Sequence, residues 1–179
     1  LLQETETKKN PLPKNSERLA FGLPDQEAKV AKPITAIVIG AGSRGSVYAA
    51  YSEQYAKSLK IVGVADPNAI RREQMATAYG IAPEHQFADW ADVFKLAKFA
   101  DAVIIATPDN LHYQPCMRAL AAGYDVLLEK PIAQTAKECT DILRQARKYG
   151  RIVGVCHVLR YAPYFRALKR VIDEGRLGD

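Results

Sequence analysis

The sequence lacks the features that mark membrane, secreted or metal-binding proteins. No apolar run in its 179 residues reaches the roughly 18 to 20 needed to span a bilayer, and no signal-peptide pattern is visible. Cysteine is scarce: Cys116, Cys139 and Cys156 are an odd number without zinc-type spacing, and each lies in an apolar periodic segment. We therefore expect reduced core cysteines and favour the cytoplasm. Because the chain begins with Leu1, an export signal in a longer parent protein is left open.

Long blocks of one charge are also missing. The formal net charge is +5, but no run of five or six basic residues and no basic-aromatic interleaving occurs, so we expect solvated helix faces and no nucleic-acid partner. An anionic cofactor would account for part of the excess. The three histidines lack metal-ligand spacing, and we expect no metal.

Short apolar runs alternate with helical patterns from Ile34 onward. Residues 1–33 are polar and contain four prolines, which predicts an extended arm or linker. The runs are continuously apolar, as in strands buried on both faces of a parallel sheet. Strands are expected at 34–40, 59–66, 101–107, 124–130 and 151–158, and helices at 45–57, 68–79, 89–98, 111–122, 134–149 and 162–175. The alternation predicts an α/β fold with a doubly wound, mostly parallel sheet.

The stretch AIVIGAGSRGSVYAAY, residues 36–51, places three glycines within six positions. Gly40, Gly42 and Gly45 follow a buried strand and begin a helix, which is the context of the dinucleotide-binding fingerprint. In this interpretation Gly40 permits a tight turn, Gly42 lets a pyrophosphate approach the backbone, and Gly45 lets the helix pack against the strand. The alternative is a glycine-rich turn without a ligand.

An acid closes the second predicted strand. Asp66 follows Gly45 by 21 residues, where a carboxylate can bind both ribose hydroxyls of a dinucleotide. It would also repel the 2′-phosphate of NADP, so NAD is favoured, although Arg71 and Arg72 offer guanidinium groups that can accommodate this phosphate. The alternative is an Asp that caps the turn before Pro67.

Later strand ends argue against a methyltransferase that uses S-adenosylmethionine, which would share the glycine-rich loop and the acid. The strand expected at 101–107 closes with Thr107 and Pro108 in ATPDNLH, a rigid turn suited to line a cofactor crevice. The strand expected at 124–130 leads into EKP, residues 129–131, which places two charges at the same mouth.

The segments GAGSRG, VADP, ATPDNLH, GYDVLLEKPIA and HVLRYAPYFRALKRVIDEGRLGD together resemble one known family. They are similar to the N-terminal domain of the glucose-fructose oxidoreductase, inositol dehydrogenase and rhizopine-catabolism oxidoreductases (Gfo/Idh/MocA). The resemblance covers residues 34–179 and is most specific at EKP. It implies a Rossmann domain at 34–160 and, at 161–179, the start of a connection to a C-terminal sheet domain that is absent from this chain.

The resemblance also implies roles for individual residues. Lys130 would reach the nicotinamide and the substrate, where a fixed cation orients a hydroxyl and stabilises a developing oxyanion, and Glu129 would position it. Arg160 and Tyr161 match the family's Arg-aromatic pair beside the nicotinamide. The alternative for Lys130 is a salt-bridged lysine at a strand end. The predicted cofactor-binding residues are Gly40, Ala41, Gly42, Ser43, Arg44, Gly45, Asp66, Thr107, Pro108, Asn110, His112, Glu129, Lys130 and Arg160.

The histidines receive separate interpretations. His157 and Tyr161 are further catalytic candidates beside Lys130, because a histidine at a strand end can act as acid or base. A structural or cofactor-edge role is favoured for both His157 and His112. His85, in a loop before a short strand, has no visible partner and is expected at the surface.

The implied activity is hydride transfer between NAD, or less favourably NADP, and a carbinol carbon of a sugar, cyclitol or similar polyol. Two alternatives keep the same motifs: an NAD-dependent glycosidase that works through transient oxidation, and a non-catalytic NAD-binding sensor. A homo-oligomer is expected. The resemblance places most substrate contacts and the general base in the C-terminal domain, so this chain alone is expected to be inactive.

Overall fold

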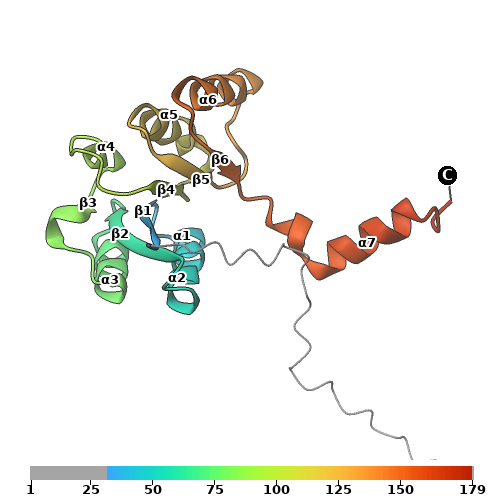
Figure 1. Ribbon diagram of the computed structural model, residues 1–179, viewed down its shortest axis with the longest axis horizontal. Coiled ribbons are helices and arrows are strands. Elements are labelled where there is room, and N and C mark those ends of the chain that lie inside the picture. The colour runs from blue at the N-terminus through green and yellow to red at the C-terminus, as the bar shows by residue number, and fades with distance from the viewer. Residues whose placement is uncertain (1–31, 179) are drawn as a thin grey trace, which may run out of the picture.

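Six strands form one parallel sheet in the computed structural model, which describes residues 32–178 (Figure 1). The strands follow the order β3-β2-β1-β4-β5-β6, and each neighbouring pair is parallel. Their bounds are β1 Ile34–Ile39, β2 Leu59–Ala65, β3 Gln86–Phe87, β4 Ala102–Ile105, β5 Asp125–Leu128 and β6 Val153–Val155. The strand order reverses between β1 and β4. The expected doubly wound sheet is therefore confirmed, and its switch point lies beside the glycine-rich loop.

Helices cover both faces of the sheet. Helices α4 (Trp90–Val93), α5 (Tyr113–Ala121) and α6 (Ala136–Tyr149) lie on one face, and α1 (Ser43–Ala49), α2 (Tyr51–Gln54) and α3 (Ala69–Tyr79) on the other (Figure 1). Single 3-10 turns occur at Pro83–His85 (η1), Asp109–Leu111 (η2) and Val158–Tyr161 (η3). The last helix, α7, spans Pro163–Asp173.

Two predicted helices differ from the structure. The helix expected at 45–57 is divided into α1 and α2, and the chain leaves the helical conformation at Tyr55. The helix expected at 89–98 is wrong beyond Val93, because the backbone turns at Phe94. This turn brings both Phe94 and Phe99 against the core, which a continuing helix would not allow.

Local capping explains the helix ends that the sequence placed well. Thr135 forms a capping box with Glu138 at the start of α6, and Gly150 ends this helix in the left-handed region. The Asn68 side chain caps α3 by accepting from the Arg71 N–H. At the end of α7, Gly175 has a φ of +66° and follows the last helical turn, as expected of a terminating glycine.

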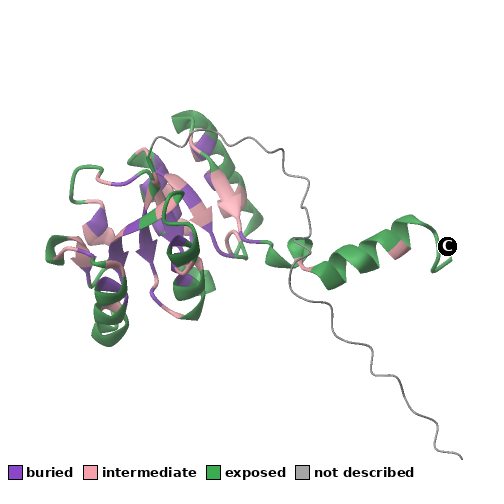
Figure 2. Ribbon diagram, turned by 60° about the horizontal axis from the view of Figure 1, so that its bottom comes forward, coloured by how far each residue is buried: buried purple, intermediate pink, exposed green. Residues whose placement is uncertain are grey.

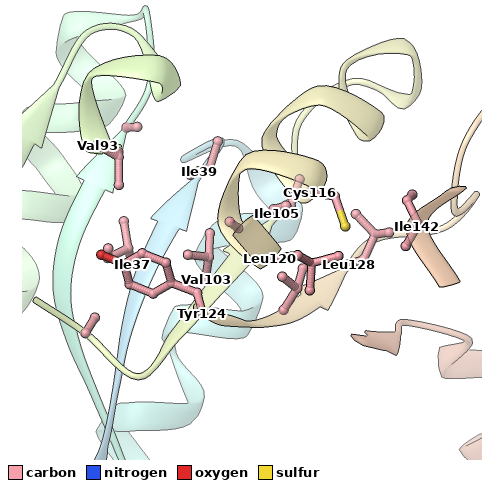
Figure 3. Close-up of a cluster of buried hydrophobic side chains, with 14 of the residues drawn as sticks. Ile37, Ile39, Val93, Val103, Ile105, Cys116, Leu120, Tyr124, Leu128 and Ile142 are labelled. Atoms are coloured by element: carbon pink, nitrogen blue, oxygen red, sulfur yellow. The ribbon is translucent and has the colours of Figure 1, made fainter. Parts of the chain in front are cut away.

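The two faces of the sheet carry separate apolar clusters because side chains alternate along each strand. Ile37 and Ile39 point to the face covered by α4, α5 and α6, together with Val103 and Leu128 (Figure 3). Val38 points to the opposite cluster, which includes residues of α3. The central strands are thus buried on both sides, and their carboxyl ends are held rigidly.

Two expectations about single side chains need correction. Cys116 and Cys156 are buried free cysteines, but Cys139 on α6 is only partly buried and does not belong to the core cluster. His85 is not a lone surface residue, because its ring stacks on Phe99 with centroids 4.0 Å apart. The ring partner of His85 is distant in sequence, so a local pattern does not contain this contact.

Helix α7 projects away from the rest of the domain and is exposed along most of its length (Figures 1 and 2). Its apolar residues recur at helical spacing and are left uncovered: Tyr164, Phe165, Leu168 and Ile172. The predicted arm at 1–33 falls almost wholly outside the described residues. The proposed division at residue 160 stays a prediction.

Candidate cofactor and active site

The glycine-rich loop lies at the carboxyl end of β1, and two of its glycines are required by the fold. Gly40 has a φ of +94°, and a Cβ there would lie 2.6 Å from the Ala106 carbonyl oxygen. A Cβ at Gly45 would collide with the Gly40 carbonyl oxygen. Gly40 therefore permits the turn next to β4, and Gly45 permits α1 to pack against the backbone of this turn.

Gly42 differs from its two neighbours. The nearest atom to a Cβ at this position would be Nη1 of Arg71, 3.8 Å away, and the backbone φ of −75° is ordinary. Neither packing nor conformation requires glycine here. The absence of a side chain instead leaves the main chain open to the cavity that Gly42 lines.

Asp66 follows β2 and fixes the glycine-rich loop. Its side chain is buried, with Oδ2 accepting from the Ala41 N–H at 2.7 Å and Oδ1 from the Asn68 N–H at 2.8 Å. A carboxylate oxygen can accept more than one hydrogen bond, so both oxygens retain capacity toward the cavity that Asp66 lines. Asp66 therefore also caps the turn after β2, by accepting from the Asn68 N–H, and this contact does not prevent it from binding a ligand.

The two arginines after Asp66 have different surroundings. Arg72 donates from Nη1 to the Asp66 carbonyl oxygen at 2.7 Å, so its guanidinium is engaged in holding the turn. Arg71 is exposed and lines the cavity together with Gly42 and Asp66. Of the two, Arg71 is the one placed to meet a phosphate.

Two cavities lie along the carboxyl edge of the sheet. The first, which we call the β2-side cavity, has a volume of about 360 Å³ and is lined by Gly40, Gly42, Asp66, Arg71, Trp90, Thr107, Pro108 and Leu111 among others. The second, the β5-side cavity, has a volume of about 370 Å³ and is lined by Arg44, Ala106, Thr107, Asp109, Glu129, Lys130, Cys156, Val158 and Leu159. Ala106 and Thr107 line both, so the two cavities flank the end of β4 at the switch point.

His112 supports this edge from within. The side chain is fully buried, with Nδ1 2.6 Å from the Pro131 carbonyl oxygen and Nε2 3.0 Å from that of Thr107. It joins the loop after β4 to the loop after β5. Both ring nitrogens are engaged with carbonyl groups of the protein, which supports a structural role, and the inclusion of His112 among the cofactor-binding residues stays a prediction.

Glu129 is the most constrained side chain of the β5-side cavity. Its buried carboxylate accepts from Arg44 Nε at 2.7 Å, from the Tyr48 hydroxyl at 2.6 Å and from the Lys130 N–H at 2.6 Å. Arg44 also donates from Nη2 to the Tyr48 oxygen at 2.7 Å. The sequence did not point to Tyr48; its only signal is the four-residue spacing from Arg44 on one helix face.

These contacts set the ionisation of the group. Burial works to raise the pKa of Glu129, but hydrogen bonds from Tyr48, Arg44 and the Lys130 N–H outweigh it and hold this pKa below its ordinary value. Burial, with hydrogen bonds to Cys156 and Glu129, raises the pKa of the Tyr48 hydroxyl, which therefore stays protonated. Glu129 is thus an anion neutralised by Arg44.

Lys130 extends from the loop after β5 and is exposed at the mouth of the β5-side cavity. Among the described residues its side chain has no hydrogen bond or ion pair, so the salt-bridged alternative finds no partner there. Ser43, Asn110, His157, Arg160 and Tyr161 are exposed and line neither cavity. The structure therefore brings Lys130 to the crevice but not His157 or Tyr161.

Residues 32–178 contain neither a group of metal-ligating side chains nor a helix suited to span a membrane. No three His, Cys, Asp or Glu side chains of this part of the chain gather closely enough to hold a metal ion. None of the helices described there is long and apolar enough to cross a membrane.

Comparison with known proteins gives a family match and several relatives. Residues 34–157 match the Gfo/Idh/MocA family model, described as "Oxidoreductase family, NAD-binding Rossmann fold". The chain is 35% identical over 142 residues to an inositol 2-dehydrogenase from Klebsiella pneumoniae, covering 79% of this chain and 42% of that protein. It is 30% identical over 157 residues to a D-glucoside 3-dehydrogenase from Escherichia coli, covering 86% and 43%.

Solved structures show the same fold. The WlbA dehydrogenase from Bordetella pertussis, solved in complex with NADH and UDP-GlcNAcA, superposes with a TM-score of 0.72 at 23% identity. The match covers 80% of this chain and 42% of that protein. The chain thus spans less than half the length of the relatives it matches.

Proposed function

Because this chain belongs to the Gfo/Idh/MocA oxidoreductase family and has its NAD-binding Rossmann fold, we propose that it binds NAD in the crevice formed by the β2-side and β5-side cavities. It serves an enzyme that transfers hydride between nicotinamide and a CH–OH carbon of a sugar, cyclitol or similar polyol. The names of the inositol and glucoside dehydrogenases support this substrate class.

The observation that carries the proposal is the contrast among the three glycines. Packing accounts for Gly40 and Gly45, whereas no contact among the described residues requires Gly42. Gly42 lies in one cavity with Asp66, and the neighbouring cavity across Thr107 contains Lys130. A buried acid, an open backbone beside it and a lysine beyond match the order of adenosine ribose, pyrophosphate and reactive nicotinamide in a dinucleotide site.

In the mechanism, the residues of the β2-side cavity hold the adenosine end. Asp66 accepts hydrogen bonds from the ribose hydroxyls, and the main chain near Gly42 faces the pyrophosphate. Thr107 and Lys130 border the other end. The nicotinamide, when bound, supplies the hydride acceptor or donor.

Lys130 carries the chemistry that this chain itself can offer. Its ammonium is exposed and not engaged by a described carboxylate, so it can donate to the substrate hydroxyl and orient it. Negative charge that develops on this oxygen is stabilised by the fixed cation. The proton acceptor is proposed to lie outside the described residues.

Asp66 also sets the preferred form of the cofactor. We propose that NAD binds more tightly than NADP, because a buried carboxylate repels a 2′-phosphate, although exposed Arg71 reduces the difference. Trp90 is the only tryptophan and lines the β2-side cavity, so its fluorescence reports binding there directly.

The test is to titrate NAD and NADP into the wild-type chain and two Asp variants. Asp66→Ser should weaken NAD by about 1 to 3 kcal/mol. Asp101→Ser is the matched control, because Asp101 also accepts a main-chain N–H, that of Thr35 at 2.8 Å, but lies away from both cavities. Equal affinity for NAD and NADP, or a preference for NADP, would overturn the assignment to Asp66.

A glycosidase that works through transient oxidation is the second candidate, and the relative named D-glucoside 3-dehydrogenase is the observation that keeps it. Both candidates need the same crevice. They differ in the net product: a dehydrogenase accumulates NADH with a polyol, whereas the glycosidase releases sugar without net NADH. A sensor would do neither, and it would have no use for Lys130.

We further propose a homo-oligomer in the cytoplasm. The uncovered apolar face of α7 supports association, since large exposed apolar patches favour contacts with other surfaces. Light scattering tests this part, and a monomer at all concentrations would contradict it.

A further inference from the structure

Three side chains join the start of α1 to the end of β5. Arg44 and Tyr48 lie one turn apart on α1, and both contact Glu129, which follows β5. Glu129 is 85 residues from Arg44 and 81 from Tyr48 in sequence. We call these three residues the α1–β5 clamp.

The clamp is built around a buried charge. The Glu129 side chain is only 6% exposed, whereas that of Arg44 is 45% exposed. A buried carboxylate is costly unless it is paired and its oxygens are satisfied. Arg44 supplies the opposite charge, Tyr48 supplies a hydroxyl donor to the same oxygen, and the Lys130 N–H occupies the other oxygen.

The hydrogen bond from the Lys130 N–H connects the clamp to the β5-side cavity. Oε2 of Glu129 holds the backbone from which the Lys130 side chain extends, while Oε1 is held by α1. A shift of Glu129 would therefore move the main chain at Lys130. The other end of the clamp belongs to the helix that begins at the glycine-rich loop.

We propose that Tyr48 and Arg44 are positioning residues that act through Glu129 to fix Lys130 beside the nicotinamide, so that the cofactor-binding loop and the reactive lysine move as one unit. This inference rests on the proposed function. Tyr48 makes no contact with the reacting groups in this scheme. Its hydroxyl sets the orientation of a carboxylate, and the carboxylate sets the lysine backbone.

The variant Tyr48→Phe tests the clamp with little disturbance, because it removes one hydroxyl and leaves the ring, whose centroid lies 5.0 Å from Arg44 Cζ. Tyr79→Phe is the matched control. Tyr79 also lies on a helix and donates to a carboxylate, Glu53 Oε1 at 2.8 Å, but it lines neither cavity.

Two readouts are measured on the full 179-residue chain. The first is amide hydrogen exchange at Lys130 without cofactor. Tyr48→Phe should speed exchange there roughly tenfold, the scale expected for losing one hydrogen bond to a buried carboxylate, while strands β1 and β4 keep wild-type rates.

The second readout is the fluorescence emission of the nicotinamide in bound NADH. This emission should change in Tyr48→Phe, although the dissociation constant of NADH, measured by quenching of Trp90, stays within about twofold of wild type. Tyr79→Phe should leave both unchanged.

Contrary outcomes are specific. Unchanged exchange at Lys130 in Tyr48→Phe overturns the clamp, and so does faster exchange throughout the sheet, which would make Tyr48 a general stability residue. Glu129→Gln provides a second variant, and it should speed exchange at Lys130 at least as much as Tyr48→Phe.

Changed exchange at Lys130 with unchanged nicotinamide emission overturns the link between the clamp and the cofactor. If NADH binds neither to the wild-type chain nor to any variant, the proposed function fails. The exchange rate at Lys130 then still decides whether the clamp exists.

Discussion

The β2-side and β5-side cavities share the end of β4 but differ in how their residues are held. On the β2 side, Asp66 is buried and bound to two main-chain N–H groups, and packing dictates Gly40 and Gly45 of the adjoining loop. On the β5 side, Glu129 is equally buried, but Lys130 next to it is exposed. The difference indicates that folding of the domain fixes the proposed cofactor site, whereas the position of Lys130, the proposed reactive residue, depends on one cluster of side chains.

The largest effect on this comparison is expected from the glycines of the loop. Gly45→Ala should lower the free energy of unfolding by about 3 kcal/mol, because its Cβ would collide with the Gly40 carbonyl oxygen. Gly42→Ala should change stability by less than about 1 kcal/mol, since only Arg71 Nη1 comes within 4 Å of the added atom. Urea unfolding measures both.

The same pair separates folding from binding. Gly42→Ala should fold normally and still lose NAD affinity by about tenfold or more, because a methyl group would occupy the close approach to the pyrophosphate. Titration by Trp90 fluorescence measures this loss. Wild-type affinity in Gly42→Ala would show that the open backbone at this glycine has no ligand.

Substitution of Lys130, the exposed residue of the β5-side cavity, tests the other half of the comparison. In a form of the protein that is active, Lys130→Met should lower polyol-dependent turnover by about 10²-fold, while NAD affinity stays nearly unchanged. Lys137→Met is the control, since Lys137 is an exposed lysine paired with Asp141 on α6. Turnover equal to wild type in Lys130→Met would return Lys130 to a structural role.

The smallest effect concerns acid stability on the β5 side. The pKa of Glu129 is lower in the folded protein than its ordinary value of 4.5, so its ionised form contributes stability above that value. This contribution is lost as the pH falls from about 4.5 through the lower folded pKa. Urea unfolding at several pH values should therefore show a shallower acid dependence for Glu129→Gln than for wild type. Identical dependence in the two proteins would contradict the buried ion pair with Arg44.

The sequence predicted the sheet well because parallel strands and glycine-rich turns leave local patterns. Apolar runs placed every strand except the two-residue β3, and the spacing of Gly40, Gly42 and Gly45 indicated the loop at the switch point. Asp66 was found for the same reason, since it follows a strand at a fixed distance from the loop.

The remaining features depend on contacts between distant residues. Tyr48 was missed because its partner Glu129 is 81 residues away, and no local pattern links them. His112 was predicted to have a structural or cofactor-edge role, and only the fold shows its ring turned inward between two carbonyl groups. The helix expected at 89–98 ended early because Phe94 and Phe99 pack on the core.

The most direct test of the account is a crystal structure of this chain with NADH. We expect the adenosine ribose within hydrogen-bonding distance of Asp66, the pyrophosphate over Gly42, and the nicotinamide in the β5-side cavity beside Lys130. NADH bound elsewhere, or bound in the crevice with the adenosine at Lys130, would contradict the proposed division between the two cavities.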